Sequence, residues 1–165
     1  VLFQKQMTLH LLREVDRAWL LEMHNCFLIR YPRDVIASYV AKRPDSGLAD
    51  LGFVQQIELY RWLDQRSGPP PPVLDARDVQ NHPRSVLSQL CERLGLAFDE
   101  AMLRWEPGRR PTDGLWAPHW YASVERSTGF APYQAKSEAV PEAFAAVYRD
   151  CLEAYEELHA LRIIP

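Results

Sequence analysis

Apolar residues along the chain follow two patterns, a short unbroken run and longer stretches at helical spacing. The unbroken run at residues 26–29 is typical of a strand buried on both faces. It ends at Arg30, and Pro32 then stands where a helix can start, because its fixed φ suits the first turn and its missing N–H would have no partner there. Apolar residues continue at helical spacing: Val35, Ile36, Tyr39 and Val40. Residues 25–43 are therefore predicted to form a strand, a tight turn and a helix.

The same reading gives the other elements. A β-prone segment at residues 1–5 opens the chain, and another short strand is expected at residues 71–75, at the end of a Gly/Pro linker. Helices are expected at residues 49–65, from Pro83 to a stop at Gly95, at 98–105, 116–124 and 141–161, with a loop at 106–113. Strands separated by helices predict a parallel sheet in an α/β domain that spans residues 1–165.

Chemically active side chains follow the predicted strands. They are Lys5 with His10, Arg30, and Asp75 with Asp78. Ligands of parallel sheets bind beyond the carboxyl ends of the strands. At Arg30 the following helix adds free backbone N–H groups and a positive dipole end. This unit is therefore predicted to bind a phosphate, sulfate or carboxylate.

Composition limits the classes of function. With 165 residues, 47% of them hydrophobic and 25% charged, the chain has the make-up of a folded domain. A net charge of −3 argues against a wide nucleic-acid surface, and no apolar run is long enough to cross a membrane. Cys26, Cys91 and Cys151 each fall in an apolar segment without CxxC spacing, so we expect reduced core thiols and a cytoplasmic protein. Neither His nor Cys spacing predicts a metal site.

Residues 30–38, RYPRDVIAS, resemble the segment of the sulfotransferase superfamily that holds the 3′-phosphate of 3′-phosphoadenosine-5′-phosphosulfate. In that family an arginine ends a strand, and a serine eight residues later reaches the same phosphate; Arg30 and Ser38 match both. Residues 74–83 resemble the strand, acidic turn and Pro-started helix found downstream. Residues 116–130 resemble the late loop that folds over the nucleotide in bacterial members.

The resemblance implies a three-layer, P-loop-like fold, with a parallel sheet flanked by helices. It also implies transfer of a sulfuryl group from 3′-phosphoadenosine-5′-phosphosulfate to a hydroxyl or amine of a small-molecule or carbohydrate acceptor, leaving adenosine 3′,5′-bisphosphate. Arg30 and Ser38 would bind the cofactor together with Ser127, Thr128 and Gly129. In the same reading His10 would be the catalytic base, and Lys5 would stabilise the bridging oxygen.

The family's Ser/Thr/Gly-rich phosphosulfate loop, which precedes these segments, has no counterpart in the sequence, and GxxxxGK[ST] does not occur. We therefore expect an N-terminally incomplete sulfotransferase-like domain. A strand edge exposed in this way would favour a homo-oligomer.

Other readings stay open at this point. The domain could bind a nucleotide without catalysis, or be a relative that transfers phosphate. Arg30 could simply pair with Asp34, Ser38 could bond its own helix, and Lys5 and His10 could be bystanders.

Overall fold

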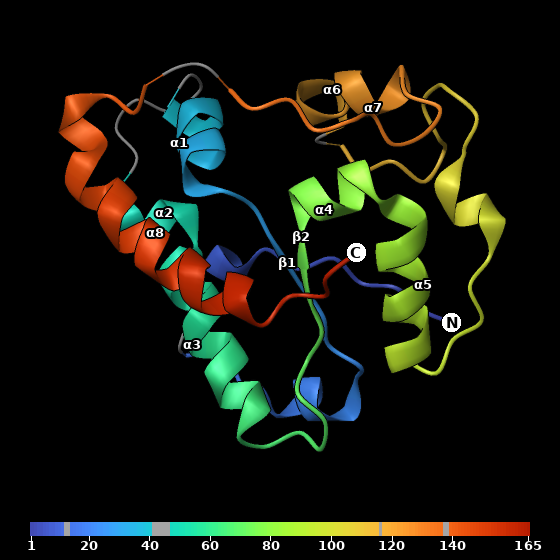
Figure 1. The fold of residues 1–165 in the computed structure, drawn as a ribbon, viewed down its shortest axis with the longest axis horizontal. Coiled ribbons are helices and arrows are strands. Elements are labelled where there is room, and N and C mark those ends of the chain that lie inside the picture. The colour runs from blue at the N-terminus through green and yellow to red at the C-terminus, as the bar shows by residue number, and fades with distance from the viewer. Residues whose placement is uncertain (12–13, 41–46, 116, 137–138) are drawn as a thin grey trace. The chain divides into compact units, whose positions relative to one another are not determined.

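The computed structural model describes residues 1–11, 14–40, 47–115, 117–136 and 139–165 (Figure 1). Contacts divide the chain into two compact units. The first contains residues 1–76 and 134–164, and the second contains residues 77–133 with Pro165. The named strands belong to the first unit, and the second unit consists of helices and loops.

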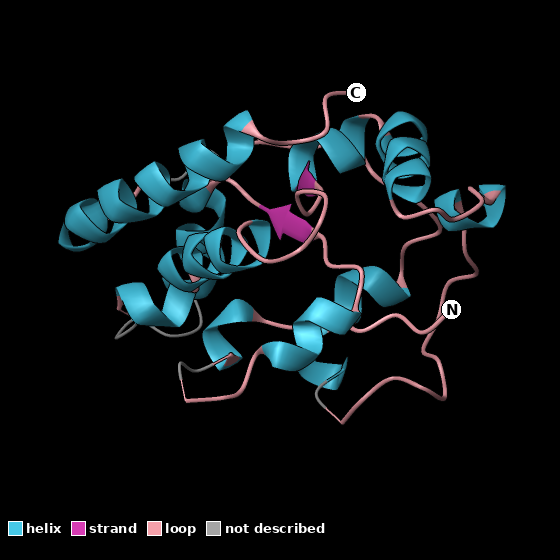
Figure 2. Ribbon diagram, turned by 90° about the horizontal axis from the view of Figure 1, so that it is seen from below, coloured by secondary structure: helices cyan, strands magenta, loops and turns pink. Residues whose placement is uncertain are grey.

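The described residues form a parallel sheet of two strands, β1 (Phe27–Ile29) and β2 (Val73–Asp75) (Figure 2). Phe27 pairs with Val73 and Ile29 with Asp75. The C-terminal segment joins the other side of β2, where the N–H of Ile163 donates to the carbonyl oxygen of Val73 at 2.8 Å. The α/β class, both strand positions and their parallel direction are therefore as predicted.

Helices α1 (Pro32–Val40), α3 (Phe53–Asp64) and α8 (Ala145–Ala160) belong to the same unit as this sheet. Phe27 and Ile29 are buried in a cluster with Tyr60, Leu63 and Tyr155. Leu28, whose side chain points to the opposite face of the strand, is 60% exposed. Leu74, its partner in the register, is 4% exposed, so the face opposite to Phe27 and Ile29 is buried at β2 and open only at β1. Within the first unit the described residues thus give a small sheet, and three layers are not seen there.

The helix expected at residues 49–65 is interrupted. It consists of α2 (Leu48–Leu51) and α3, with Gly52 between them in the left-handed conformation at φ 76°. The hydroxyl of Thr8 donates to the carbonyl oxygen of Gly52 at 3.0 Å. The helical spacing of apolar residues continues across the break, which is why periodicity alone predicted one helix.

The strand expected at residues 1–5 is wrong. Residues 1–7 form neither helix nor strand, and two 3₁₀ helices follow, η1 (Thr8–His10) and η2 (Ala18–Glu22). Phe3 is 80% exposed, and Val1 and Leu2 are also exposed. A β-prone sequence becomes a strand only when a neighbouring strand pairs with it and its side chains pack, and neither condition is met here.

In the second unit, the helix expected at residues 98–105 is only a short 3₁₀ helix, and the one expected at 116–124 is divided into two short helices. The elements of this unit are α4 (Ala76–Asn81), which continues directly from β2, α5 (Pro83–Arg93), η3 (Glu100–Leu103), α6 (Ala117–Trp120) and α7 (Ala122–Glu125). Pro83 begins α5 as predicted, and Gly95 follows it with φ 67°. Helix α4 had not been expected. In the first unit, the last predicted helix begins as η4 (Glu142–Phe144) and continues as α8.

The three cysteines are free thiols, but they do not share one environment. Cys91 and Cys151 are buried as predicted, and burial raises the pKa of Cys151 to about 11. Cys26 is exposed, so its placement in the core is wrong. The strand begins one residue later, at Phe27, and this leaves Cys26 outside the ladder.

We predict that Gly52→Ala lowers the free energy of unfolding by about 1–2 kcal/mol, because an L-residue is strained in the left-handed conformation. In addition, a Cβ atom there would lie 2.9 Å from the Thr8 hydroxyl oxygen. Urea denaturation would measure the change. Gly68→Ala is the matched control, since a Cβ at Gly68 meets nothing within 4 Å. Equal stabilities of the two variants would contradict the prediction.

Candidate functional site

Arg30 and Ser38 lie on the strand–turn–helix unit that the sequence predicted. Arg30 directly follows β1, Ser38 lies on α1, and both side chains are exposed. The N–H groups of Asp34 and Val35 donate to the carbonyl oxygen of Tyr31 at 3.0 and 3.3 Å, which fixes the start of the helix. The guanidinium of Arg30 makes no hydrogen bond or ion pair with another described residue. A pairing of Arg30 with Asp34 is therefore not seen.

Asp75 lies beside this unit at the carboxyl edge of the sheet. It pairs in register with Ile29, the residue before Arg30, and its side chain is 1% exposed. The hydroxyl of Tyr155, from α8, donates to Oδ2 of Asp75 at 2.6 Å inside the protein. A buried carboxyl group needs such donors, because removing it from water is otherwise costly. Helix α8 thereby fixes the end of β2.

A group of tyrosines at the same edge was missed by the sequence analysis. The ring of Tyr31 meets the ring of Tyr155 edge-on, with centroids 5.6 Å apart. Its hydroxyl oxygen lies 2.9 Å from that of Tyr148, also on α8, and the guanidinium of Arg33 lies 5.7 Å from the Tyr31 ring centroid. The seven-residue spacing of Tyr148 and Tyr155 on the apolar stripe of the last helix was the available signal.

These contacts change the acidity of Tyr148. The hydrogen bond with Tyr31, followed by burial, raises the pKa of Tyr148 to about 12. The charge of Glu156 acts in the same direction, whereas the positive charge of Arg33 opposes the shift. Tyr148 is therefore a neutral phenol at physiological pH.

Lys5 and His10 occupy the irregular N-terminal part of the first unit. Lys5 lies in the extended segment before η1, and His10 is the last residue of η1. Both side chains are exposed, and neither makes a hydrogen bond or ion pair with another described residue. Their catalytic roles stay predictions.

Ser127, Thr128 and Gly129 belong to the second unit, where Thr128 and Gly129 line an open groove of about 690 Å³. An isolated antiparallel bridge joins Gly129 to Arg104, and the N–H of Trp105 donates to the carbonyl oxygen of Thr128 at 3.1 Å. The groove is lined by Pro83, Leu103, Arg104, Trp105, Glu106, Thr128, Gly129 and Phe130.

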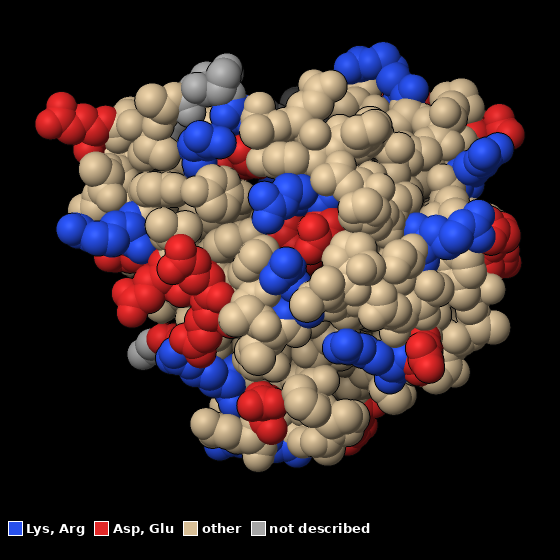
Figure 3. Space-filling view, in the orientation of Figure 1, with Lys and Arg blue, Asp and Glu red and all other residues tan. Residues whose placement is uncertain are grey.

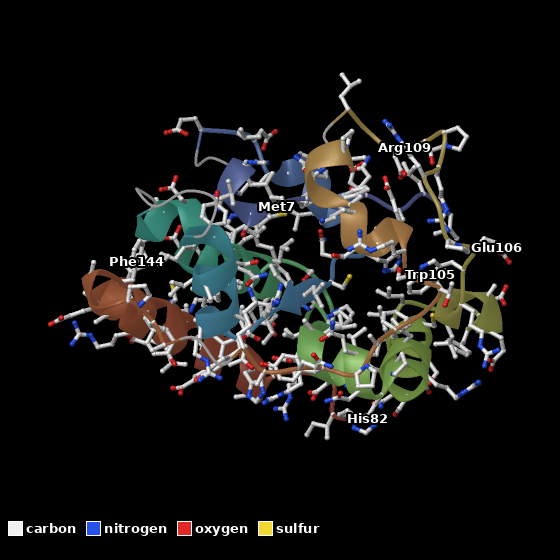
Figure 4. The ribbon with its side chains drawn as sticks, turned by 90° about the horizontal axis from the view of Figure 1, so that it is seen from above. Met7, His82, Trp105, Glu106, Arg109 and Phe144 are labelled. Atoms are coloured by element: carbon white, nitrogen blue, oxygen red, sulfur yellow. The ribbon has the colours of Figure 1, made fainter. Side chains whose placement is uncertain are left out.

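The three loop residues differ in what they can offer a ligand. The hydroxyl of Ser127 accepts from Nε1 of Trp105 at 3.0 Å and donates to the carbonyl oxygen of Val124 at 2.7 Å. Its proton is thus already used within the protein. Thr128 is exposed beside Trp105, which continues through Glu106 into the loop that carries Arg109 (Figure 4). Thr128 is therefore the hydroxyl of this loop that a ligand can reach.

Taken by itself, the edge of the first unit can bind an anion. It combines an exposed, unengaged cation at Arg30 with the N-terminus of a nine-residue helix. The described residues include no group of three or more His, Cys, Asp or Glu side chains that could hold a metal ion. They also contain no helix long and apolar enough to cross a membrane.

Comparison with known proteins identifies the family. A family model described as a sulfotransferase domain matches residues 2–158, which is nearly the whole chain. The protein therefore belongs to the sulfotransferase domain family. No solved structure matches the chain significantly.

Two curated proteins of Arabidopsis thaliana are similar to parts of the chain. Branched-chain-amino-acid aminotransferase-like protein 2 is 37% identical over 131 residues, which cover 79% of this chain and 23% of that protein. Branched-chain-amino-acid aminotransferase-like protein 1 is 39% identical over 126 residues, which cover 76% of this chain and 22% of that protein. The match thus spans less than a quarter of either relative.

We predict that Tyr155→Phe lowers the free energy of unfolding by about 1.5–3 kcal/mol, because the buried Asp75 loses a hydrogen-bond donor while the ring is kept. Urea denaturation followed by circular dichroism would measure the loss. Tyr39→Phe on α1 is the control, since its hydroxyl makes no hydrogen bond with another described residue. A change below about 0.5 kcal/mol for Tyr155→Phe, the usual range for surface substitutions, would contradict the prediction.

Proposed function

We propose that this chain carries the nucleotide 3′-phosphate site of a sulfotransferase that uses 3′-phosphoadenosine-5′-phosphosulfate. One observation carries the proposal. In a chain of the sulfotransferase domain family, Arg30 stands unengaged at the carboxyl end of a parallel strand, eight residues before an exposed Ser38 on the helix that follows.

The residues present fit a phosphate group. The guanidinium of Arg30 can donate two parallel hydrogen bonds to phosphate oxygens, and Ser38 can add a third donor. The N-terminus of α1 contributes partial positive charge through the helix dipole. A charge-assisted contact of this kind is worth about 1.5–3 kcal/mol. The cofactor would supply an activated sulfuryl group, and the protein would position it and neutralise negative charge.

The remaining roles follow the predicted assignments. His10 would accept the proton of the acceptor hydroxyl or amine, a task that suits an imidazole because its pKa lies near neutral pH. Lys5 would stabilise negative charge on the bridging oxygen. In the late loop, Thr128 and Gly129 would contact the nucleotide, and Ser127 would keep Trp105 in place beside them. The acceptor would be a small molecule or a carbohydrate.

A binding domain without catalysis remains the second candidate, because the residues assigned to the nucleotide account for its 3′-phosphate half only. The two relatives are named aminotransferase-like proteins, but the match covers only 22–23% of their length. The sulfotransferase family model, in contrast, covers residues 2–158 of this chain. We therefore do not propose aminotransferase activity.

We predict that adenosine 3′,5′-bisphosphate raises the melting temperature of the protein and that Arg30→Ala weakens its binding at least about tenfold, because 1.4 kcal/mol corresponds to a factor of ten. Calorimetric titration would give both affinities. Ser38→Ala should lose less, since it removes one neutral donor. Arg93→Ala, which removes an exposed arginine in the last turn of α5, is the control. Equal affinity in Arg30→Ala and the native chain would overturn the 3′-phosphate assignment.

We further predict that His10→Ala keeps the native affinity for adenosine 3′,5′-bisphosphate. The variant should slow sulfuryl transfer, measured as formation of the bisphosphate from 3′-phosphoadenosine-5′-phosphosulfate, at least about 100-fold, which is the usual contribution of a general base. Formation of the bisphosphate would be measured with phenol, sugar and amine acceptors. An unchanged rate would exclude His10 as the base. Tight nucleotide binding with no turnover in the native chain would instead favour the binding domain.

A further inference from the structure

Two phenols at the carboxyl edge of the sheet have one donor more than they use. The hydroxyl oxygens of Tyr31 and Tyr148 lie 2.9 Å apart, so one O–H donates to the other oxygen. A phenol has a single proton, and the hydroxyl that accepts this bond therefore keeps its own proton for another acceptor. No other described residue accepts it. The pair thus presents an O–H donor that the protein leaves unused.

Arg33 lies close to this pair and has no described carboxylate partner. The guanidinium of Arg33 lies 5.7 Å from the centroid of the Tyr31 ring, and its charge reaches the phenol of Tyr148. Nε of Arg33 is buried without a hydrogen-bond partner, and no described carboxylate forms an ion pair with Arg33. A half-buried arginine with an unsatisfied N–H is costly unless another group compensates its charge.

We propose that Arg33, Tyr31 and Tyr148 form a binding site for an oxyanion, distinct from the Arg30–Ser38 site. The ligand is a sulfate, phosphate or carboxylate group, either free or at the end of a larger molecule. Such a group supplies acceptor oxygens for the spare O–H and negative charge for the guanidinium.

The negative charges on α8 oppose the binding of an anion at this site. Exposed acidic side chains gather over this helix (Figure 3): Asp150, Glu153, Glu156 and Glu157. Among them, Glu156 acts electrostatically on Tyr148, in opposition to Arg33. The carboxylate of Glu156 therefore weakens the binding of an anion at this place. Removing the charge of Glu156 should strengthen anion binding, whereas removing the Tyr148 hydroxyl should weaken it.

The site does not depend on the proposed nucleotide site. Tyr31 packs against Tyr155 and bonds to Tyr148, both on α8, whereas Arg30 makes no polar contact with this group. Failure of nucleotide binding in Arg30→Ala would therefore leave the oxyanion site intact. Conversely, loss of the oxyanion site would leave the assignment of Arg30 to the 3′-phosphate unaffected.

The test is a titration of the ¹⁵N-labelled protein with sodium sulfate, with sodium chloride added to hold ionic strength constant. The Nε–H resonance of Arg33, assigned by its absence in Arg33→Lys, should shift saturably. Tyr148→Phe, which removes a hydroxyl and keeps the ring, should raise the dissociation constant for sulfate at least threefold. Glu156→Gln should lower it about twofold. Tyr39→Phe should leave it unchanged.

Sodium acetate and adenosine 3′,5′-bisphosphate identify the source of the group. If the bisphosphate displaces sulfate from Arg33, the site exists and its ligand is a nucleotide phosphate. If only acetate displaces sulfate, the site exists and its ligand is a carboxylate. The proposal is overturned if the Arg33 resonance does not shift with sulfate. It is also overturned if Tyr148→Phe melts like the native chain and binds sulfate with unchanged affinity.

Discussion

The parallel pairing of β1 with β2 is the constraint on which the first unit depends. It aligns Ile29 with Asp75, and Ile163 extends the hydrogen bonding on the far side of β2. Strands this short are not stable alone in water. The buried residues of α8 and α3 join Phe27 and Ile29 in one core, so the ladder and the helices stabilise each other. The backbone position of Arg30 is fixed because this arrangement holds the end of β1.

Helix α8 links the core to the candidate site. Its buried residues pack into the core, while Tyr155 reaches the carboxyl of Asp75 and Tyr148 reaches the hydroxyl of Tyr31. One helix thus holds the ends of both strands through hydrogen bonds between residues 80 and 117 positions apart in the sequence. Stability and site geometry are therefore coupled, and substitutions in α8 can affect ligand binding without touching Arg30.

The sequence predicted the features that local chemistry determines. The apolar run before Arg30, Pro32, Pro83 and Gly95 each act within a few residues, and the structure follows them. The interruption at Gly52 and the irregular N-terminal segment depend on neighbours far away in the chain, such as the bond from Thr8 to Gly52. The positions of Arg30 and Ser38 at the candidate site were likewise predictable, but the Tyr31–Tyr148 contact was not, because no local pattern encodes a partner 117 residues away.

Four of the described arginines differ in what lies near their charge. Arg61 is held by Glu157, and Arg84 by Glu100, at exposed positions where such pairs contribute little to stability. Arg30 and Arg33 have no described carboxylate partner, although the chain carries a net charge of −3 and many acidic side chains. Other described arginines, such as Arg93 and Arg149, also lack a carboxylate partner, so Arg30 and Arg33 are set apart by their place beside the carboxyl edge of a parallel sheet, where an anion is favoured. Position in the fold thus favours an anion at this edge of the first unit, independently of family membership.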